Sequence, residues 1–537
     1  MKNIIQKKVF VISALLVCCF LIGCDQGGVP NKDSRDLISM GDLGVTIGSL
    51  VKMSWPEDVP LEGYGLVVGL NGTGSVECPQ HIRTYLGQHL QTLFPNRRID
   101  VAKFMGDLDT AVVLVRGIMP MVASRNENFD VKVSALDGTQ TTSLEGGWLL
   151  GTELKPVGTF GLATRVIANA KGTVYLDKLD VSTKNKRLGY VLAGGKVLDE
   201  YKVTLELKKT DFRITNIIRN RLNELFGDVT AKVVLPGVLD VSVPAKYKEQ
   251  KRRFISIIEM TYLTYNPVII NERIKVFTNK LAALQDADAS EIALEAIGNQ
   301  SLEALSLLLT VGNEEVRLRA ARCMLNLGSD AGLAILRQMA LDRKCSYRFI
   351  AFEAIAAGAR RNDTVRICQR LLRDNDIRVR LVAYEQLRKL EDVSVLQELV
   401  GNNFYLEQIG QTQQKAIFVS RSGQPCVVLF GAPIECSEGI FVRSEDGNIT
   451  INAPSGQSYV SVIRKHPRRD GVVLQLKSSF VLSDIISTLC EKPKEEGEPG
   501  KGGLGVAYAD VIALLKLMCD KGAVRAEFWA GALPKID

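Results

Sequence analysis

The stretch of this sequence that most suggests a chemical role is residues 61–74, LEGYGLVVGLNGTG, which places five glycines around a short apolar run. These glycines are Gly63, Gly65, Gly69, Gly72 and Gly74. Glycines at this density permit close backbone approach or positive φ, and they are typical of loops that hold phosphate groups. A nucleotide-binding loop is therefore the first interpretation to test.

Two requirements of a phosphate-binding loop are missing here. A nucleoside-triphosphate loop needs a lysine and then serine or threonine after its glycines, whereas Gly74 is followed by SVE. A dinucleotide fingerprint needs GxGxxG between a strand and a helix, but Gly63, Gly65 and Gly69 are spaced GxGxxxG, with an Asn-Gly turn signal downstream. We therefore interpret the stretch as a strand that ends in a glycine-rich turn.

A metal site is the second chemistry to consider. Cys78, His81 and His89 lie in or beside one amphipathic stretch, residues 78–93. Their spacing does not match one face of a helix, and no acidic partner is near in the sequence. We interpret the two histidines as surface or capping residues.

No catalytic constellation stands out in the rest of the chain. Asp107 and Asp109 are one residue apart and lack a third ligand, so a turn is the simpler interpretation. The whole sequence contains three histidines, so few side chains are suited to act as a general acid, a general base or a metal ligand near neutral pH. We predict that the protein is not an enzyme and that it uses no cofactor and no metal.

The N-terminus predicts export. Residues 1–8 carry three lysines, and residues 9–22 form an apolar run that is shorter than the ~20 residues a spanning helix needs. Leu21, Ile22, Gly23 and Cys24 resemble the lipobox of bacterial lipoproteins. This predicts a signal peptide over residues 1–23, a lipidated Cys24 and a polar tether over residues 24–35. Ordinary secretory cleavage is the alternative.

Composition limits the partners and the number of domains. At 537 residues the chain is too long for one core, so several domains are expected. Removal of residues 1–23, with three lysines and no acidic residue, lowers the formal net charge from +7 to +4. This small excess gives no indication of nucleic-acid binding.

The cysteines predict few disulfides. Eight cysteines follow Cys24, which is too sparse for a dense disulfide framework. Cys323, Cys345 and Cys368 lie in helical patterns, where a buried free thiol is common. Cys426 and Cys436 have a separation that suits a hairpin disulfide.

The first half of the chain alternates strands and helices. Strands are expected over residues 111–115, 129–133, 203–207 and 240–243, because apolar residues are continuous or alternate there. Helices are expected over residues 78–93, 214–226 and 247–260, with Gly227 as a stop signal. The pattern predicts an α+β body.

Four blocks in this half resemble a known family. After the glycine-rich stretch come FDVKVSALDGTQTTSLEGGWLLGTELK at residues 129–155, which contains Gly146 and Gly147, and TDFRITNIIRNRLNELFG at residues 210–227. Residues 240–273, with DVSVPA and VIINER, follow. The order is similar to that of the flagellar P-ring protein family. The resemblance implies a P-ring-like α+β domain over residues 36–275, whose ring-forming architecture the seven glycines would shape.

Residues 285–400 are predicted to be helical throughout. The segments ALEAI, AARCM, AFEAI and AYEQL, which begin at Ala293, Ala320, Ala351 and Ala383, form a faint repeat with spacings of 27, 31 and 32 residues. Stacked helix pairs of about this period form solenoids, so we predict an inserted HEAT-like array. A plain helical bundle is the alternative.

The remainder is predicted to be β-rich. Residues 405–490 contain short strands separated by turn signals, and residues 464–469 make a basic turn that is either a solvated hairpin tip or a contact for an anionic polymer. Residues 491–505 are expected to be a flexible linker. Residues 506–537 resemble the helix and strand that complete the P-ring-like part.

The resemblance implies a structural role in the bacterial flagellum. The expected protein is a homo-oligomeric ring in the periplasm around the rod of the basal body, with rod and L-ring proteins and peptidoglycan as partners, and a lipid on Cys24 that anchors it to the outer or the inner membrane. The family is usually exported without lipid, and the helical insertion is not usual in it. The alternative is a non-flagellar lipoprotein adaptor that binds a protein partner through its helical repeats.

Overall fold

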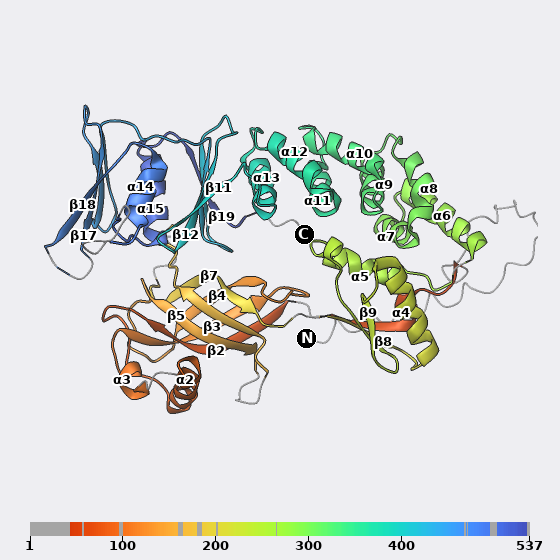
Figure 1. The fold of residues 1–537 in the computed structure, drawn as a ribbon, viewed down its shortest axis with the longest axis horizontal. Coiled ribbons are helices and arrows are strands. Elements are labelled where there is room, and N and C mark those ends of the chain that lie inside the picture. Colours follow the sequence, from red (N-terminus) through yellow and green to blue (C-terminus); the bar gives the residue numbers. More distant parts are fainter. Residues whose placement is uncertain are drawn as a thin grey trace, which may run out of the picture. The chain divides into compact units, whose positions relative to one another are not determined.

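The structure is a computed structural model that describes residues 43–55, 58–95, 100–158, 165–179, 185–199, 202–264, 266–466, 469, 471–493 and 502–533 (Figure 1). The predicted signal peptide, Cys24 and the tether lie outside the described residues. None of the helices within these ranges is long and apolar enough to cross a membrane. The mixture of helices and strands confirms the predicted α+β class.

A closed barrel contains the glycine-rich stretch. Its strands follow one another around the barrel in the order β2-β3-β4-β7-β6-β5, and each pair is antiparallel. Their bounds are β2 (Val59–Val68), β3 (Thr110–Met119), β4 (Asn128–Ala135), β5 (Trp148–Pro156), β6 (Ala168–Thr173) and β7 (Leu188–Val197).

Two helices explain why β3 reads as a continuous apolar run. Ala111, Val113 and Val115 point into the barrel core, whereas Val112 packs outside it against α2 (Gln80–Leu93) and α3 (Val101–Met105). Both faces of this part of β3 are therefore buried, and alternation is lost. The predicted helix over residues 78–93 is α2.

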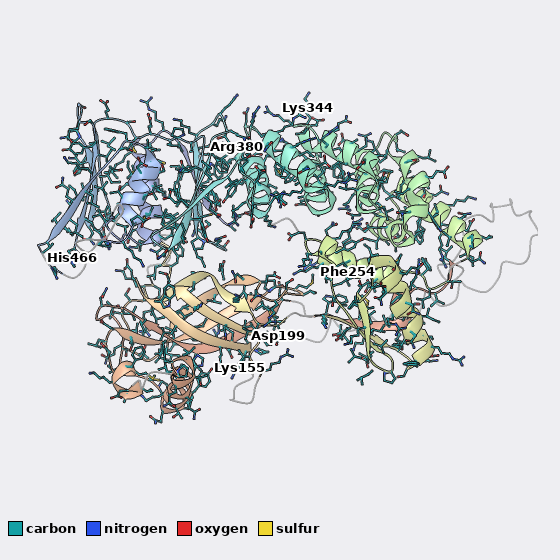
Figure 2. The ribbon with its side chains drawn as sticks, viewed as in Figure 1. Lys155, Asp199, Phe254, Lys344, Arg380 and His466 are labelled. Atoms are coloured by element: carbon teal, nitrogen blue, oxygen red, sulfur yellow. The ribbon has the colours of Figure 1, made fainter. Side chains whose placement is uncertain are left out.

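A four-stranded sheet and its helices form the second body. The strand order is β1-β8-β10-β9, and the elements are α1 (Ile47–Leu50), β1 (Val51–Ser54), β8 (Val203–Leu207), α4 (Phe212–Phe226), β9 (Ala231–Leu235), β10 (Val238–Val241) and α5 (Lys251–Met260). Asp211 caps α4 by accepting from the backbone N–H groups of Arg213 and Ile214, and Gly227 ends it at φ +104°. Phe254 of α5 lies in the apolar core of this body (Figure 2).

Helices occupy residues 267–389. They are α6 (Pro267–Ala282), α7 (Ala287–Ile297), α8 (Leu302–Leu308), α9 (Glu314–Asn326), α10 (Asp330–Leu341), α11 (Arg348–Gly358), α12 (Arg361–Leu371) and α13 (Ile377–Lys389). The prediction of helix up to residue 400 was wrong at its end, because residues 396–400 form strand β11. The HEAT-type assignment stays a prediction.

Two sheets and two helices form the β-rich region. One sheet has the order β11-β12-β14-β13-β19 and the other β15-β16-β17-β18, and Figure 1 shows helices α14 and α15 between them. The bounds are β11 (Leu396–Val400), β12 (Phe404–Ile409), β13 (Ala416–Ser420), β14 (Cys426–Phe430), β15 (Ile440–Arg443), β16 (Ile449–Ala453), β17 (Val460–Lys465), β18 (Val473–Ser478), α14 (Leu482–Cys490), α15 (Tyr508–Asp520) and β19 (Glu527–Gly531).

The C-terminal helix and strand pack in this region. β19 pairs in parallel with β13, and α15 contributes Val511, Leu515 and Met518 to the core between the two sheets. α15 also contacts the P-ring-like part, where the ring of Tyr508 lies near that of Tyr175 with centroids 5.9 Å apart, and the expectation that residues 506–537 complete that part stays a prediction. The predicted linker falls partly outside the described residues, but Leu504 and Val506 donate backbone hydrogen bonds to Thr488 and Leu489 of α14.

Every residue of β13 and β14 is buried because the five-stranded sheet is covered on both faces. Phe418, Val428 and Phe430 face the helices of residues 316–389, whereas Val419 and Val427 face α14 and α15. Arg380 of α13 lies at the first of these interfaces, where its Nη1 donates to the carbonyl of Gln414 at 2.8 Å (Figure 2).

The same geometry overturns the predicted hairpin disulfide. Cys426 and Cys436 are both free thiols. Cys426 faces the helical side of the sheet and Cys436 the opposite core, so the two side chains point into different cores. Burial raises the pKa of each thiol to about 12, which makes both poor nucleophiles.

Candidate functional site

The site predicted from the sequence begins with two glycines inside β2, which is paired with β3 on one side and β5 on the other. A β-carbon on Gly63 would lie 2.1 Å from the carbonyl oxygen of Glu153, and one on Gly65 would lie 2.3 Å from the Thr152 hydroxyl oxygen. The β2–β5 register shifts between Glu62 and Val67. Gly63 therefore permits close approach of a backbone carbonyl, and Gly65 permits close approach of the Thr152 side chain.

The next three glycines form the predicted turn after β2. Gly69 and Gly72 have φ of +77° and +84°, with open space where a β-carbon would be. Asn71 also has positive φ, at 51°. Gly74 is different, because a β-carbon there would lie 2.0 Å from the carbonyl oxygen of Thr110. Two glycines in this turn are therefore needed for conformation and one for close packing.

The backbone N–H groups of the turn are already used. The Gly72 N–H donates to the Asp109 carboxylate at 2.6 Å. The N–H groups of Thr73, Gly74 and Ser75 donate to backbone carbonyls at 2.8–3.1 Å. A phosphate-binding loop needs such groups for its ligand, and here a carboxylate occupies one of them. The geometry therefore agrees with rejection of the nucleotide interpretation.

The second glycine-rich block lies against this turn. Thr73 Oγ1 donates to the Ser143 carbonyl at 2.8 Å, and the Thr142 N–H donates to the Thr73 carbonyl at 2.9 Å. Gly146 adopts φ +74°, and a β-carbon on Gly147 would lie 2.3 Å from Val67 Cγ1. The structure thus brings together all seven glycines that the sequence singled out, at the turn and along β2.

Asp107 and Asp109 form a turn, as predicted, and the turn has a structural role. Asp107 Oδ1 accepts from the Asp109 N–H at 3.0 Å, and Asp109 Oδ1 accepts from Gly72. The two carboxylates therefore hold backbone N–H groups of neighbouring turns. Their arrangement orders the glycine-rich turn and supplies no acid or base.

The interpretation of His89 as a surface residue was wrong, whereas His81 is exposed as expected. His89 Nε2 lies 2.6 Å from the Gly151 carbonyl on β5, and its Nδ1 lies 3.7 Å from Glu153. The acidic partner comes from β5, more than sixty residues away in sequence. Tyr85 also donates to Glu153, and burial together with the charge of Glu153 raises the pKa of its phenol. This cluster attaches α2 to the barrel.

Metal binding finds no support in the described ranges. Among the described residues, no group of three or more His, Cys, Asp or Glu side chains is placed to hold a metal ion. Cys78, the third residue of the sequence pattern, directs its thiol to the Pro79 carbonyl at 3.5 Å.

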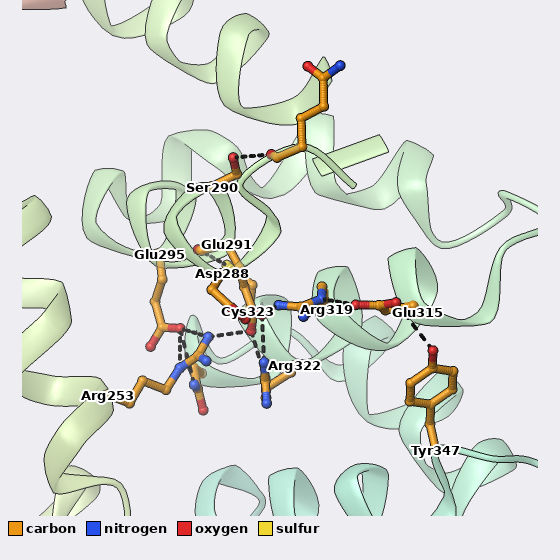
Figure 3. Close-up of polar contacts among 12 residues, drawn as sticks. Arg253, Asp288, Ser290, Glu291, Glu295, Glu315, Arg319, Arg322, Cys323 and Tyr347 are labelled. Carbon is orange, nitrogen blue, oxygen red and sulfur yellow. Dashed lines mark hydrogen bonds and ion pairs between the residues drawn. The ribbon is translucent and has the colours of Figure 1, made fainter. Parts of the chain in front are cut away.

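A buried ion network joins α5 to α7 and α9, and sequence reasoning missed it (Figure 3). Arg253 of α5 contacts Glu291 of α7 at 2.7 Å, and Arg322 of α9 makes two hydrogen bonds of 2.6 Å to the same carboxylate. Glu291 is 1% exposed. Burial alone would raise its pKa, but the charges of Arg253 and Arg322 and their hydrogen bonds lower it to about 2.

The network extends along both helices. Arg253 also donates to Glu295, while Arg319 contacts Glu315 at 2.9 Å and the exposed Asp288. Pairs of carboxylates at i, i+4 on α7 and of arginines at i, i+3 on α9 are a sequence signal for such a network. Like-charge pairs at this spacing occur equally on a solvated helix face, so the pattern alone does not reveal a buried network.

Comparison with known proteins relates the first half of the chain to one family. Residues 46–295 match the family model described as flagellar P-ring protein. These residues contain both glycine-rich blocks, the four-stranded sheet and most of helix α7.

Curated relatives carry the same description. The flagellar P-ring protein of Helicobacter pylori strain G27 is 24% identical over 238 residues, which is 43% of this chain and 66% of that protein. Those of Wolinella succinogenes and Thermotoga maritima are each 29% identical, over 44% and 40% of this chain and 68% and 67% of theirs. The chain thus spans about two thirds of the length of these relatives. Residues 46–295 form a domain of the flagellar P-ring protein family.

Proposed function

We propose that this chain is a structural subunit of a periplasmic ring around the flagellar rod. The family match over residues 46–295 carries the proposal. The family is one of structural ring proteins and not of enzymes. The glycine-rich site is consistent with a structural role. Its seven glycines serve backbone packing and turn geometry, and the N–H groups of residues 72–75 are satisfied within the chain.

A ring requires each subunit to contact two neighbours through different surfaces. The expected partners are further copies of the chain, rod and L-ring proteins, and peptidoglycan. The barrel and the four-stranded sheet would form the part of the subunit shared with other P-ring proteins. The helices and the β-rich region from residue 296 onward lie outside the matched residues and would add surface to the ring.

Deletion of the gene tests this function. We expect cells without the chain to lose swimming and to regain it when the wild-type chain is supplied. Hook–basal bodies purified from wild-type cells should contain the chain, detected with an antibody against its β-rich region. Normal swimming of the deletion strain, or purified basal bodies that lack the chain, would contradict the proposal.

We further propose a lipid anchor on Cys24, which rests on the lipobox-like residues 21–24. Radiolabelled palmitate should enter the wild-type protein and should not enter a Cys24→Ala variant. Equal labelling of the two proteins, or labelling of neither, would eliminate the anchor while leaving the ring proposal in place.

The second candidate is a non-flagellar adaptor, which the helices of residues 296–389 favour because they lie outside the P-ring match. In that case the protein would act as a monomer and hold a protein partner on its helical array. A strain that swims normally without the gene would point to the adaptor, provided that the protein is expressed in that organism.

A further inference from the structure

The four-stranded sheet ends in an exposed strand with a basic and apolar surface. Among the described strands, β9 has one neighbour, β10. Val234 and Leu235 at its end are 52% and 60% exposed, and Phe212 at the start of α4 is 61% exposed. Lys232 on the strand is exposed as well.

The β9–β10 turn touches the segment before α4, so the exposed side chains at the end of β9 and at the start of α4 lie at one end of this sheet. The Leu207 N–H donates to the Gly237 carbonyl at 2.8 Å, and a β-carbon on Gly237 would lie 3.1 Å from Thr210 Cγ2. The same segment exposes Lys209 and Arg213, and its one exposed acid, Asp211, caps α4. We call this patch the basic edge: Lys209, Phe212, Arg213, Lys232, Val234 and Leu235.

The five-stranded sheet also ends in an exposed strand, and its surface has the opposite charge. Within the part of the chain that the structure describes, β11 pairs with β12 alone. Val393, Leu396 and Leu399 are 88%, 66% and 47% exposed. Glu391, which precedes Val393, and Glu398, which lies between the two leucines, are exposed as well. We call this patch the acidic edge: Glu391, Val393, Leu396, Glu398 and Leu399.

The sequence around the acidic edge is one-sided in charge. Residues 390–414 contain no lysine and no arginine. Acidic side chains on an exposed edge strand oppose pairing with a second acidic edge, because like charges then face each other. They favour a partner that is basic and apolar.

We propose that the basic edge of one copy of this chain docks on the acidic edge of a second copy. Both patches are apolar, their charges are opposite, and each presents the free backbone edge of a five-residue strand. Because the two patches differ, the contact is heterologous and leaves one unused patch of each kind at the ends of a dimer. Such a contact repeats, and it closes into a ring when the rotation permits.

The choice of a second copy rests on complementarity within the chain. A contact between two basic edges, or between two acidic edges, would bring like charges together. In the proposed ring, these two patches would be the surfaces through which neighbouring subunits touch. Closure into a ring rests on the proposed function, whereas the contact between two copies does not.

Two blocked variants test the contact, studied in the chain from residue 25 onward, which lacks the predicted signal peptide and lipid. Leu235→Asp places an acid in the basic edge, and Leu396→Lys places a base in the acidic edge. Each should weaken self-association in sedimentation velocity at least about tenfold, because apolar surface is lost and like charges then face each other across the contact. Leu307→Asp, at a residue of α8 that is 69% exposed, is the matched control and should associate as the wild type does.

Mixing the two blocked variants gives the sharpest result. The Leu396→Lys chain keeps an intact basic edge and the Leu235→Asp chain an intact acidic edge, so the mixture should form a 1:1 dimer and nothing larger. A wild-type chain that stays monomeric up to its solubility limit would overturn the inference. So would a mixture of two monomers, or self-association of either blocked variant at wild-type strength.

The solution test is separate from the test of function. If the wild-type chain self-associates and the deletion strain swims normally, the flagellar function is contradicted and the contact is supported. If the wild-type chain is monomeric and the deletion strain does not swim, the contact is contradicted and the function is supported.

Discussion

Gly63 and Gly69 belong to one sequence motif, but each lacks a β-carbon for a different reason. At Gly63 the carbonyl oxygen of Glu153 occupies the space that a β-carbon would take, whereas at Gly69 the space is open and the positive φ is the constraint. An alanine at Gly69 should cost about 1–2 kcal/mol, the usual penalty of the left-handed region. An alanine at Gly63 has to displace a neighbouring strand.

We therefore predict that Gly63→Ala destabilises the barrel more than Gly69→Ala does. Amide hydrogen exchange in peptides from β2 and β5 measures this locally. Gly63→Ala should speed exchange in both strands, and Gly69→Ala should act mainly at the turn. Equal protection of β5 in the two variants would contradict the packing role of Gly63.

The ion network at α5, α7 and α9 should stabilise the packing of these helices. Removing one partner of a buried ion pair costs about 3–5 kcal/mol, because the remaining charge is left uncompensated. Glu291→Gln leaves Arg253 and Arg322 without their shared carboxylate. We expect it to lower the free energy of unfolding of this region by an amount of that order, measured by urea denaturation.

Asp288→Asn is the matched control, since Asp288 contacts Arg319 of the same network and its side chain is 91% exposed. Exposed pairs contribute about 0–1 kcal/mol, so the control should change stability little. Equal losses in the two variants would contradict the assignment of Glu291 as the centre of the network.

Because of the Glu291 carboxylate, we expect the free energy of unfolding to depend on pH. The pKa of Glu291 is lowered to about 2 in the folded chain, from 4.5 for a free glutamate side chain. A group whose pKa is lowered on folding contributes stability above its unfolded pKa and loses that contribution as the pH falls through its folded pKa. The contribution, roughly 3 kcal/mol, should therefore be complete above pH 5 and disappear towards pH 2. The Glu291→Gln variant should lack this part of the acid dependence, and wild-type acid sensitivity in the variant would contradict it.

Local signals predicted the elements well. Apolar periodicity and the stop signal at Gly227 placed α4, and apolar patterns placed α2, β3 and β4. Pairings between distant segments were not predictable from such signals. The closure of the barrel, the contact of His89 with Glu153, and the pairing of β19 with β13 each join residues far apart in sequence.

The glycine site was predicted in part. The sequence excluded phosphate binding, because the lysine and the following helix are missing. It did not reveal that Asp109 accepts from Gly72 or that the block at Ser143 lies against Thr73. Both contacts depend on the barrel, whose closure no local pattern records.

At the scale of the molecule, the helical segment shares its core with the β-rich region. Phe418, Val428 and Phe430 of the five-stranded sheet pack with helices α9–α13 in one apolar cluster. Excision of residues 285–400 should therefore expose one face of that sheet, and the shortened chain should aggregate or bind a hydrophobic dye. A soluble shortened chain with native β-sheet circular dichroism would show that the helices are an independent module.

The central claim is that the chain builds the ring around the flagellar rod. Electron cryotomography of basal bodies in intact cells tests it most directly, by comparison of averages from wild-type and deletion strains and from a strain that carries the chain without residues 285–400. We predict a ring around the periplasmic part of the rod in the wild type and its absence in both other strains. A ring of unchanged density in the deletion strain would contradict the claim.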